Sequence, residues 1–137
     1  MVKFFSLIAA FITLASEAAL LTNASPVNSE VVARADGQHH GQATFFFQNG
    51  GTGACGQKHS DNDFIVALET TEYANGAHCG KTIAITDSNS GKTVNGVIAD
   101  ECPGCGAKNN IDLSVGLFTQ FESESVGVFP VVWVFVD

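Results

Sequence analysis

Residues 97–114 constrain the fold of this chain more than any other stretch. They begin as an apolar segment, Val97 to Ala99, reach the acid Asp100, turn through Cys102-Pro-Gly-Cys105 and arrive at a second acid, Asp112. A tight turn of this composition brings the segments on its two sides close together. We therefore expect both carboxylates to lie in one loop region at one end of the fold.

The first 40 residues differ in composition from the rest. A basic Lys3 precedes an apolar run over residues 4–15 and then small residues, which is typical of a secretory signal peptide. Residues 23–42 are polar, contain proline and show no periodicity. We predict a signal peptide at 1–18 with cleavage between 18 and 24, a loose arm or propeptide at 19–40, and one folded domain at 41–137. The mature protein is expected to be extracellular, with no membrane segment.

All four cysteines lie in this small domain, where extra cross-links are valuable because the core is thin. An even cysteine count in a secreted chain predicts two disulfide bonds, although counting leaves three pairings open. A zinc site is the alternative, but one Cys-x-x-Cys pair is a weak metal signal. We expect no metal and no cofactor. The cysteines are Cys55, Cys79, Cys102 and Cys105.

The charge balance excludes some partners. Fourteen Asp and Glu against six Lys and Arg give a formal net charge of −8 at pH 7. A field of this sign repels phosphate backbones and anionic lipid, so we expect neither nucleic acid nor a membrane surface as partner. Neutral polymers and basic partners remain open.

Short β-branched and aromatic runs separated by turn residues predict an all-β barrel or sandwich. The expected strands are Ala43–Phe47, Thr82–Thr86, Thr93–Ala99 and Val128–Val136, with a hairpin loop at Asp87–Gly91. Two short helices are expected as well. One covers Phe64–Leu68 after a Ser60-x-x-Asp63 cap, and the other covers Val115–Phe121 after Ser114.

Six short motifs follow one another along the domain. They are Gly53-Ala-Cys-Gly56, Asp63-Phe-Ile-Val-Ala-Leu68, Cys79-Gly-Lys81, Ile98-Ala-Asp-x-Cys-Pro103, Asp112-Leu-Ser-x-x-Leu-Phe118 and Val131-Val-Trp-Val-Phe135. This ordered series resembles the double-psi β-barrel domain of expansins, plant natriuretic-peptide-like proteins, barwin and rare lipoprotein A-like proteins, and is most similar to small fungal secreted members. The resemblance implies a six-stranded barrel with a shallow polar groove, and disulfide bonds Cys55–Cys79 and Cys102–Cys105.

The same resemblance implies a polysaccharide groove. In expansins and barrel-type lytic transglycosylases the aspartate of the Asp-Leu-Ser motif is implicated in polysaccharide action, and Asp112 falls on it. Asp100 matches the other acid beside the groove, and Thr44 and Tyr73 are candidate neighbours. The simpler interpretation is that either acid only accepts local backbone hydrogen bonds. Trp133, inside an apolar strand, is expected in the core.

Hydrolysis is not favoured by these residues. An inverting mechanism needs a base about 6.5–9.5 Å from the acid. Related barrel endoglucanases place that base at the end of the first strand, where this chain has Gln48, whose amide cannot take a proton. A retaining mechanism would need Asp100 about 5 Å from Asp112. Lytic cleavage needs only one acid/base, and Asp112 could serve.

Histidines add two weaker candidates. His39 and His40 are placed in the loose arm. A disordered pair of polar residues is a more common explanation there than a copper-binding site. Cys55, His59, His78 and Cys79 could gather a metal only if the two cysteines are not bridged.

Three functions follow. The first is a secreted barrel that binds cell-wall polysaccharide without hydrolysis. The second is a secreted effector or protease inhibitor that binds a protein through residues 87–91 and 101–110. The third is a glycan-cleaving lytic enzyme that uses Asp112.

Overall fold

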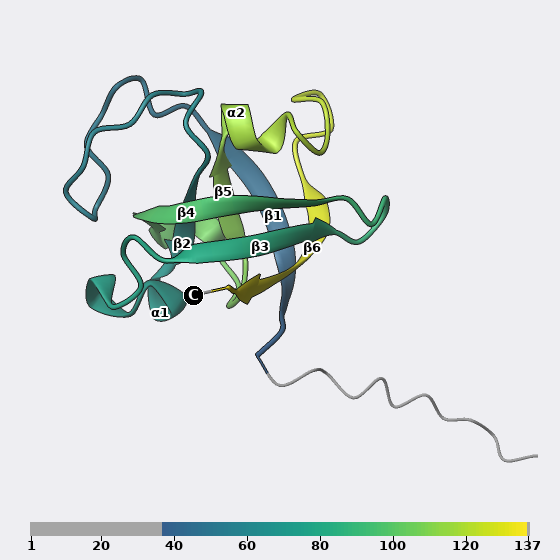
Figure 1. The fold of residues 1–137 in the computed structure, drawn as a ribbon, viewed down its shortest axis with the longest axis horizontal. Helices are drawn as coiled ribbons and strands as arrows, with labels where there is room; N and C mark the ends of the chain where they lie inside the picture. Colours follow the sequence, from purple (N-terminus) through teal and green to yellow (C-terminus); the bar gives the residue numbers. More distant parts are fainter. Residues whose placement is uncertain (1–36, 137) are drawn as a thin grey trace, which may run out of the picture. The chain divides into compact units, whose positions relative to one another are not determined.

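Six strands close into one barrel in the computed structural model, which describes residues 37–136 (Figure 1). The strand order around the barrel is β1-β5-β2-β4-β3-β6. The strands are β1 His39–Phe46, β2 Ile65–Glu69, β3 Thr82–Asp87, β4 Thr93–Cys102, β5 Ile111–Ser114 and β6 Phe129–Phe135. The helices are α1 Thr70–Tyr73 and α2 Val115–Phe118, and two 3-10 turns, η1 and η2, cover Ala74–Gly76 and Pro103–Cys105. The predicted all-β, six-stranded double-psi barrel with two short helices is confirmed.

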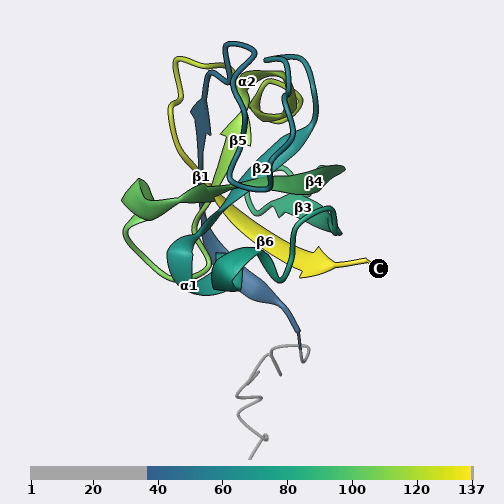
Figure 2. The ribbon, with the colours of Figure 1, turned by 90° about the vertical axis from the view of Figure 1, so that its left-hand side faces the viewer.

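The barrel pairs some strands that are close in sequence and others that are far apart in sequence. β1 pairs with β5 and β2 with β4 in parallel, while the other four pairings around the barrel are antiparallel. The two helices lie at opposite ends of the barrel (Figure 2). Helix α2 follows directly after β5, and helix α1 follows directly after β2. The predicted hairpin loop at 87–91 connects the antiparallel strands β3 and β4. Within the described residues, no helix is long and apolar enough to span a membrane.

Aliphatic and aromatic side chains from all six strands fill the barrel. Trp133 is fully buried, as expected, and its indole Nε1 donates a hydrogen bond to the Asn109 carbonyl at 2.8 Å. Phe118 of α2 closes one end of the core, with its ring 4.8 Å from that of Phe45 and 5.2 Å from that of Phe129. A continuous apolar interior of this kind supplies most of the stabilisation of such a domain.

The helix predicted at Phe64–Leu68 was wrong, because residues Ile65–Glu69 form strand β2. This strand lies between β4 and β5, and its first four residues are all buried. A strand that is covered on both faces loses the apolar–polar alternation that would distinguish it from a helix.

The second helix begins at Val115 as predicted but ends at Phe118, three residues early. Ser114 precedes it without a side-chain capping bond. Its hydroxyl donates instead to the Asp63 carbonyl and accepts from the Ile65 N–H at 3.2 Å. The serine thus joins β5 to the segment that enters β2.

Strand β1 begins before the predicted domain start, so the placement of His39 and His40 in the loose arm was wrong. The His39 ring stacks on Trp133, with centroids 3.8 Å apart and planes 8° from parallel. Its Nδ1 lies 3.6 Å from a Glu72 carboxylate oxygen. These contacts hold the first strand onto the barrel. The predicted signal peptide, and the arm up to residue 36, lie outside the described residues.

Two disulfide bonds join the pairs that the resemblance implied. Cys55–Cys79 links residues 24 apart in sequence and packs against the core, whereas Cys102–Cys105 closes a turn of four residues. Because Cys55 and Cys79 are bonded to each other, the candidate metal set with His59 and His78 loses two of its four ligands.

Candidate functional site

Four residues form one row across four neighbouring strands, which we call the cross-strand row. Thr44 of β1 pairs in register with Asp112 of β5, and Asp112 pairs with Ala67 of β2. Ala67 in turn pairs with Asp100 of β4. Partners in register project from the same face of a sheet, and each strand step is about 4.8 Å. The row therefore places a hydroxyl and two carboxylates on one side of the barrel.

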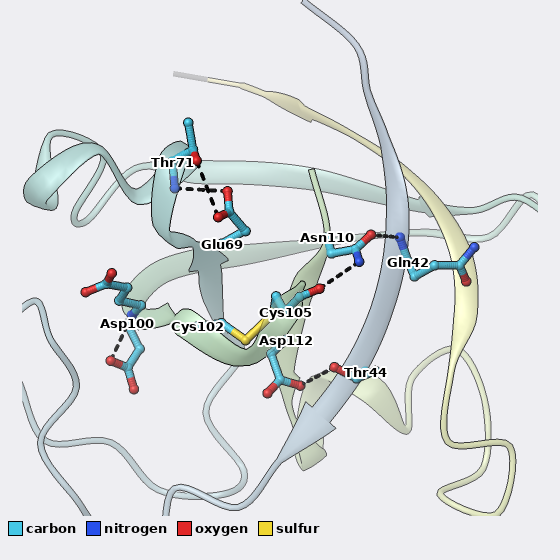
Figure 3. Close-up of a disulfide and its surroundings, with 10 residues drawn as sticks. Gln42, Thr44, Glu69, Thr71, Asp100, Cys102, Cys105, Asn110 and Asp112 are labelled. Atoms are coloured by element: carbon cyan, nitrogen blue, oxygen red, sulfur yellow. Dashed lines mark hydrogen bonds between the residues drawn. A yellow bond between two sulfur atoms is a disulfide. The ribbon is translucent and has the colours of Figure 1, made fainter. Parts of the chain in front are cut away.

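A hollow of about 230 Å³ opens beside this row. Figure 3 shows the disulfide turn above Asp112, with Thr44 on β1 directed at the carboxylate. Its wall thus combines two strands and the turn that the Cys102–Cys105 bond closes. The residues that line the hollow are Gln42, Thr44, Cys102, Gly104, Cys105, Asn110, Ile111 and Asp112.

Asp112 is the ionisable side chain of the hollow. It is half-buried, and its Oδ1 accepts a hydrogen bond from Thr44 Oγ1 at 2.7 Å. Burial raises the pKa of the Asp112 carboxyl, and the negative charge of Asp100 adds to the rise, while the bonds from Thr44 and the Leu113 N–H oppose it. A carboxyl of this kind can exchange a proton nearer to neutral pH than an exposed one.

Asp100 has a different task in the structure. Its Oδ1 accepts the N–H of Ala54 at 2.7 Å and the N–H of Glu101 at 2.8 Å. These bonds hold the loop that contains Cys55 against the end of β4. Asp100 thus belongs to the cross-strand row but does not line the hollow.

Sequence reasoning missed two residues that shape the wall. The Asn110 side chain links the disulfide turn to β1, because its Nδ2 donates to the Cys105 carbonyl and its Oδ1 accepts the Gln42 N–H, both at 2.8 Å. Gln42 stands two residues before Thr44 on the same strand, so alternation along β1 could have identified it. No comparable local signal marked Asn110.

Tyr73 was wrongly expected at the groove. It is only 8% exposed, ends α1 and packs in the core, with its hydroxyl oxygen 3.7 Å from Cys79 Sγ. Its length allows it to reach inward from the helix and to cover the Cys55–Cys79 bond. Gln48 is also buried, and its Nε2 donates to the Gly51 carbonyl at 3.0 Å, so its amide stabilises a turn.

The geometry offers one carboxyl to a ligand rather than a catalytic pair. The main chains of Asp100 and Asp112 lie two strand steps apart, about 9–10 Å across the sheet, whereas the two carboxyl groups of retaining glycosidases are about 5 Å apart. An inverting base must face the water beside the sugar, whereas Asp100 does not line the hollow and its Oδ1 accepts two backbone N–H groups at the loop of Cys55.

Plant proteins are among the relatives of this chain by sequence, whereas no family model matches it. Ripening-related protein 6 of Oryza sativa subsp. japonica is 36% identical over 89 residues, covering 61% of this chain and 53% of that protein. Kiwellin of Actinidia chinensis var. chinensis is 38% identical over 98 residues, covering 61% and 46%. The chain spans about half the length of these curated relatives.

Solved structures share the barrel. A mutant Clavibacter michiganensis expansin in complex with cellohexaose matches with a TM-score of 0.66 at 28% identity, over 73% of this chain and 50% of that one. The Streptomyces papain inhibitor matches with a TM-score of 0.62 at 25% identity, over 73% of this chain and 94% of the inhibitor. The scaffold is therefore one that expansins and a protease inhibitor both use.

Asp112 is expected to make the domain less stable as pH rises. Its folded pKa lies above the value of an unfolded chain, so the folded state binds more protons between the two values. The contribution of Asp112 to the free energy of unfolding should fall as pH rises through that interval, and Asp112→Asn should remove this contribution. In urea unfolding from about pH 3 to about pH 7, the free energy of unfolding of Asp112→Asn should rise relative to that of the native protein as pH rises. A native protein that gains on the variant instead would contradict the buried-carboxyl interpretation.

Proposed function

We propose that this protein is a secreted, expansin-like barrel that binds cell-wall polysaccharide at the hollow without hydrolysing it. The observation that carries this proposal is the hollow itself, where Asp112 and Thr44 present hydrogen-bonding atoms in a built wall. Hydroxyl-rich ligands need such fixed polar groups. The structurally similar expansin, which was solved in complex with cellohexaose, supports polysaccharide binding. The two disulfide bonds support secretion. Membership of the small fungal group stays part of the proposal.

Binding without cleavage fits the site better than hydrolysis. Among the residues that line the hollow, Asp112 is the one carboxyl, and Gln48, outside it, supports a turn with its amide. A single carboxyl can still position a sugar hydroxyl by accepting its hydrogen bond. The residues proposed to contact the polysaccharide are Asp112 and Thr44 in the hollow, with Asp100 outside it on the cross-strand row.

The test is retention on insoluble cellulose, chitin and peptidoglycan. The native protein should bind at least one of them, and Asp112→Asn should weaken that binding about tenfold, because a hydrogen bond to a charged group is lost. Glu124→Gln is the matched control, since it removes one exposed acid outside the hollow. Failure of the native protein to bind any polymer would refute the proposal.

Protein binding is the second candidate, and the papain inhibitor favours it because the match covers 94% of that chain. The contact was expected from residues 87–91 and 101–110 together. These segments flank the two ends of β4, a strand of ten residues, so they lie roughly 30 Å apart. One compact contact would use either segment alone. Inhibition of papain-type proteases that survives Asp112→Asn would favour this candidate.

Lytic cleavage by Asp112 is the remaining candidate. It needs one acid/base, and the raised pKa of Asp112 suits a proton donor. Release of soluble glycan fragments that disappears in Asp112→Asn would establish it. Release that persists in the variant would clear Asp112 of a catalytic role.

A further inference from the structure

The hollow has no aromatic side chain on which a neutral sugar could stack. Protein sites for neutral glycans gain much of their contact area from planar aromatic side chains, yet none of the eight lining residues is aromatic. The tyrosine and tryptophan of the domain are buried in the core. Affinity at this hollow must therefore come mainly from hydrogen bonds and charge.

The one charged residue that lines the hollow is an acid. Asp112 is the ionisable group among the lining residues, and no lysine, arginine or histidine lines the wall. Asp100 is close enough to act on Asp112 through its negative charge. The nearby base of the 106–110 loop, Lys108, lies 3.4 Å from a Glu72 carboxylate oxygen, so a paired acid offsets its charge. Carboxylate-bearing glycans are thereby disfavoured.

A half-buried carboxylate gains most from a cation. Burial disfavours the charged form of Asp112, and an ammonium group in the hollow would compensate this cost directly. An ammonium also carries three N–H donors, which can reach the Asp112 carboxylate and another acceptor in the wall, such as Thr44 Oγ1. Neutral N-acetyl or hydroxyl groups offer weaker bonds at the same position.

We propose that the hollow at Asp112 recognises amine-bearing glycans, of the class of β-linked glucosamine polymers, in preference to neutral ones. This inference rests on the proposed function and specifies its ligand. The cross-strand row lets one amino group meet Asp112 while a neighbouring unit continues across the sheet toward Asp100, two strand steps away.

The experiment compares three hexasaccharides by calorimetry at mildly acidic pH: hexaglucosamine, its fully N-acetylated form and cellohexaose. We expect hexaglucosamine to bind about tenfold or more tightly than either, because one charge-assisted contact is added. The preference should shrink toward unity in Asp112→Asn, persist in Glu124→Gln and weaken with added salt. The first variant retains an oxygen that can accept from Thr44.

Each other outcome has a definite meaning. Neutral hexasaccharides that bind as tightly as hexaglucosamine would overturn the amine preference and leave the proposed function standing. A preference that survives Asp112→Asn would show that the amine is not read in the hollow, which also overturns the inference. If poly-lysine displaces hexaglucosamine at equal amine concentration, the hollow recognises amines of any kind and the glycan class is overturned. No binding of any glycan would remove both proposals.

Discussion

Replacing Cys55 and Cys79 together by alanine is expected to lower the free energy of unfolding by about 3–4 kcal/mol. The bond closes a long loop, since its cysteines are 24 residues apart, and its removal frees the unfolded chain. It also packs beside Tyr73 against the core, so some packing is lost as well. Chemical denaturation of the variant and the native protein under one set of conditions measures the difference.

The matched control is the other disulfide bond. Replacing Cys102 and Cys105 by alanine frees a loop of only four residues, for which the same loop-entropy argument gives about 2 kcal/mol. The first variant should therefore be clearly the less stable of the two. Equal losses, or the opposite order, would contradict the argument that loop length and core packing set the ranking.

Gly41→Ala is expected to cost about 3 kcal/mol or more, because the new methyl group would overlap main-chain atoms. A Cβ at this position would lie 2.2 Å from the Asn109 carbonyl oxygen and 3.0 Å from the Asn110 nitrogen. Neither atom belongs to a flexible side chain. The segment at 109–110 must move, and the bond from Trp133 Nε1 to the Asn109 carbonyl should break.

The chain has one tryptophan, so its fluorescence reports this event directly. Gly41→Ala should alter the emission of Trp133 along with the unfolding midpoint. Gly104→Ala is the control, because a Cβ there meets no atom within 4 Å and the glycine does not adopt positive φ. A Gly41→Ala protein with native stability and native emission would mean that residues 109–110 yield without cost.

Secondary structure was predicted correctly where one face of a segment is more exposed to solvent than the other, or where a turn forms from neighbouring residues. Strand β3 alternates between buried and half-buried residues, and its alternation is visible in Thr82-Ile-Ala-Ile. The loop at Asp87–Gly91 was equally clear, because turn residues form a hairpin by local chemistry: the Asp87 carboxylate accepts the Asn89 N–H at 2.9 Å. Such features depend on residues that are close in sequence.

Prediction failed where the environment is set by distant segments. Residues 65–68 are as compatible with a buried helix as with a strand, and only their position between β4 and β5 decides. Tyr73 has a polar tip and a loop-like context, yet the fold buries it against the Cys55–Cys79 bond. Asn110 can link β1 to the disulfide turn only because the fold places these two segments side by side.

The sequence by itself determined the all-β character, the turn chemistry and, through its ordered motifs, the barrel, and it singled out Asp112 as the acid of the proposed site. Tertiary structure decided that Thr44, 68 residues before Asp112, supplies its hydrogen bond, and that Asp100 serves a loop rather than the hollow. The physical reason is that local patterns specify which side of a strand is buried. Strand register, which is a property of pairs far apart in the chain, specifies which polar groups meet on the other side.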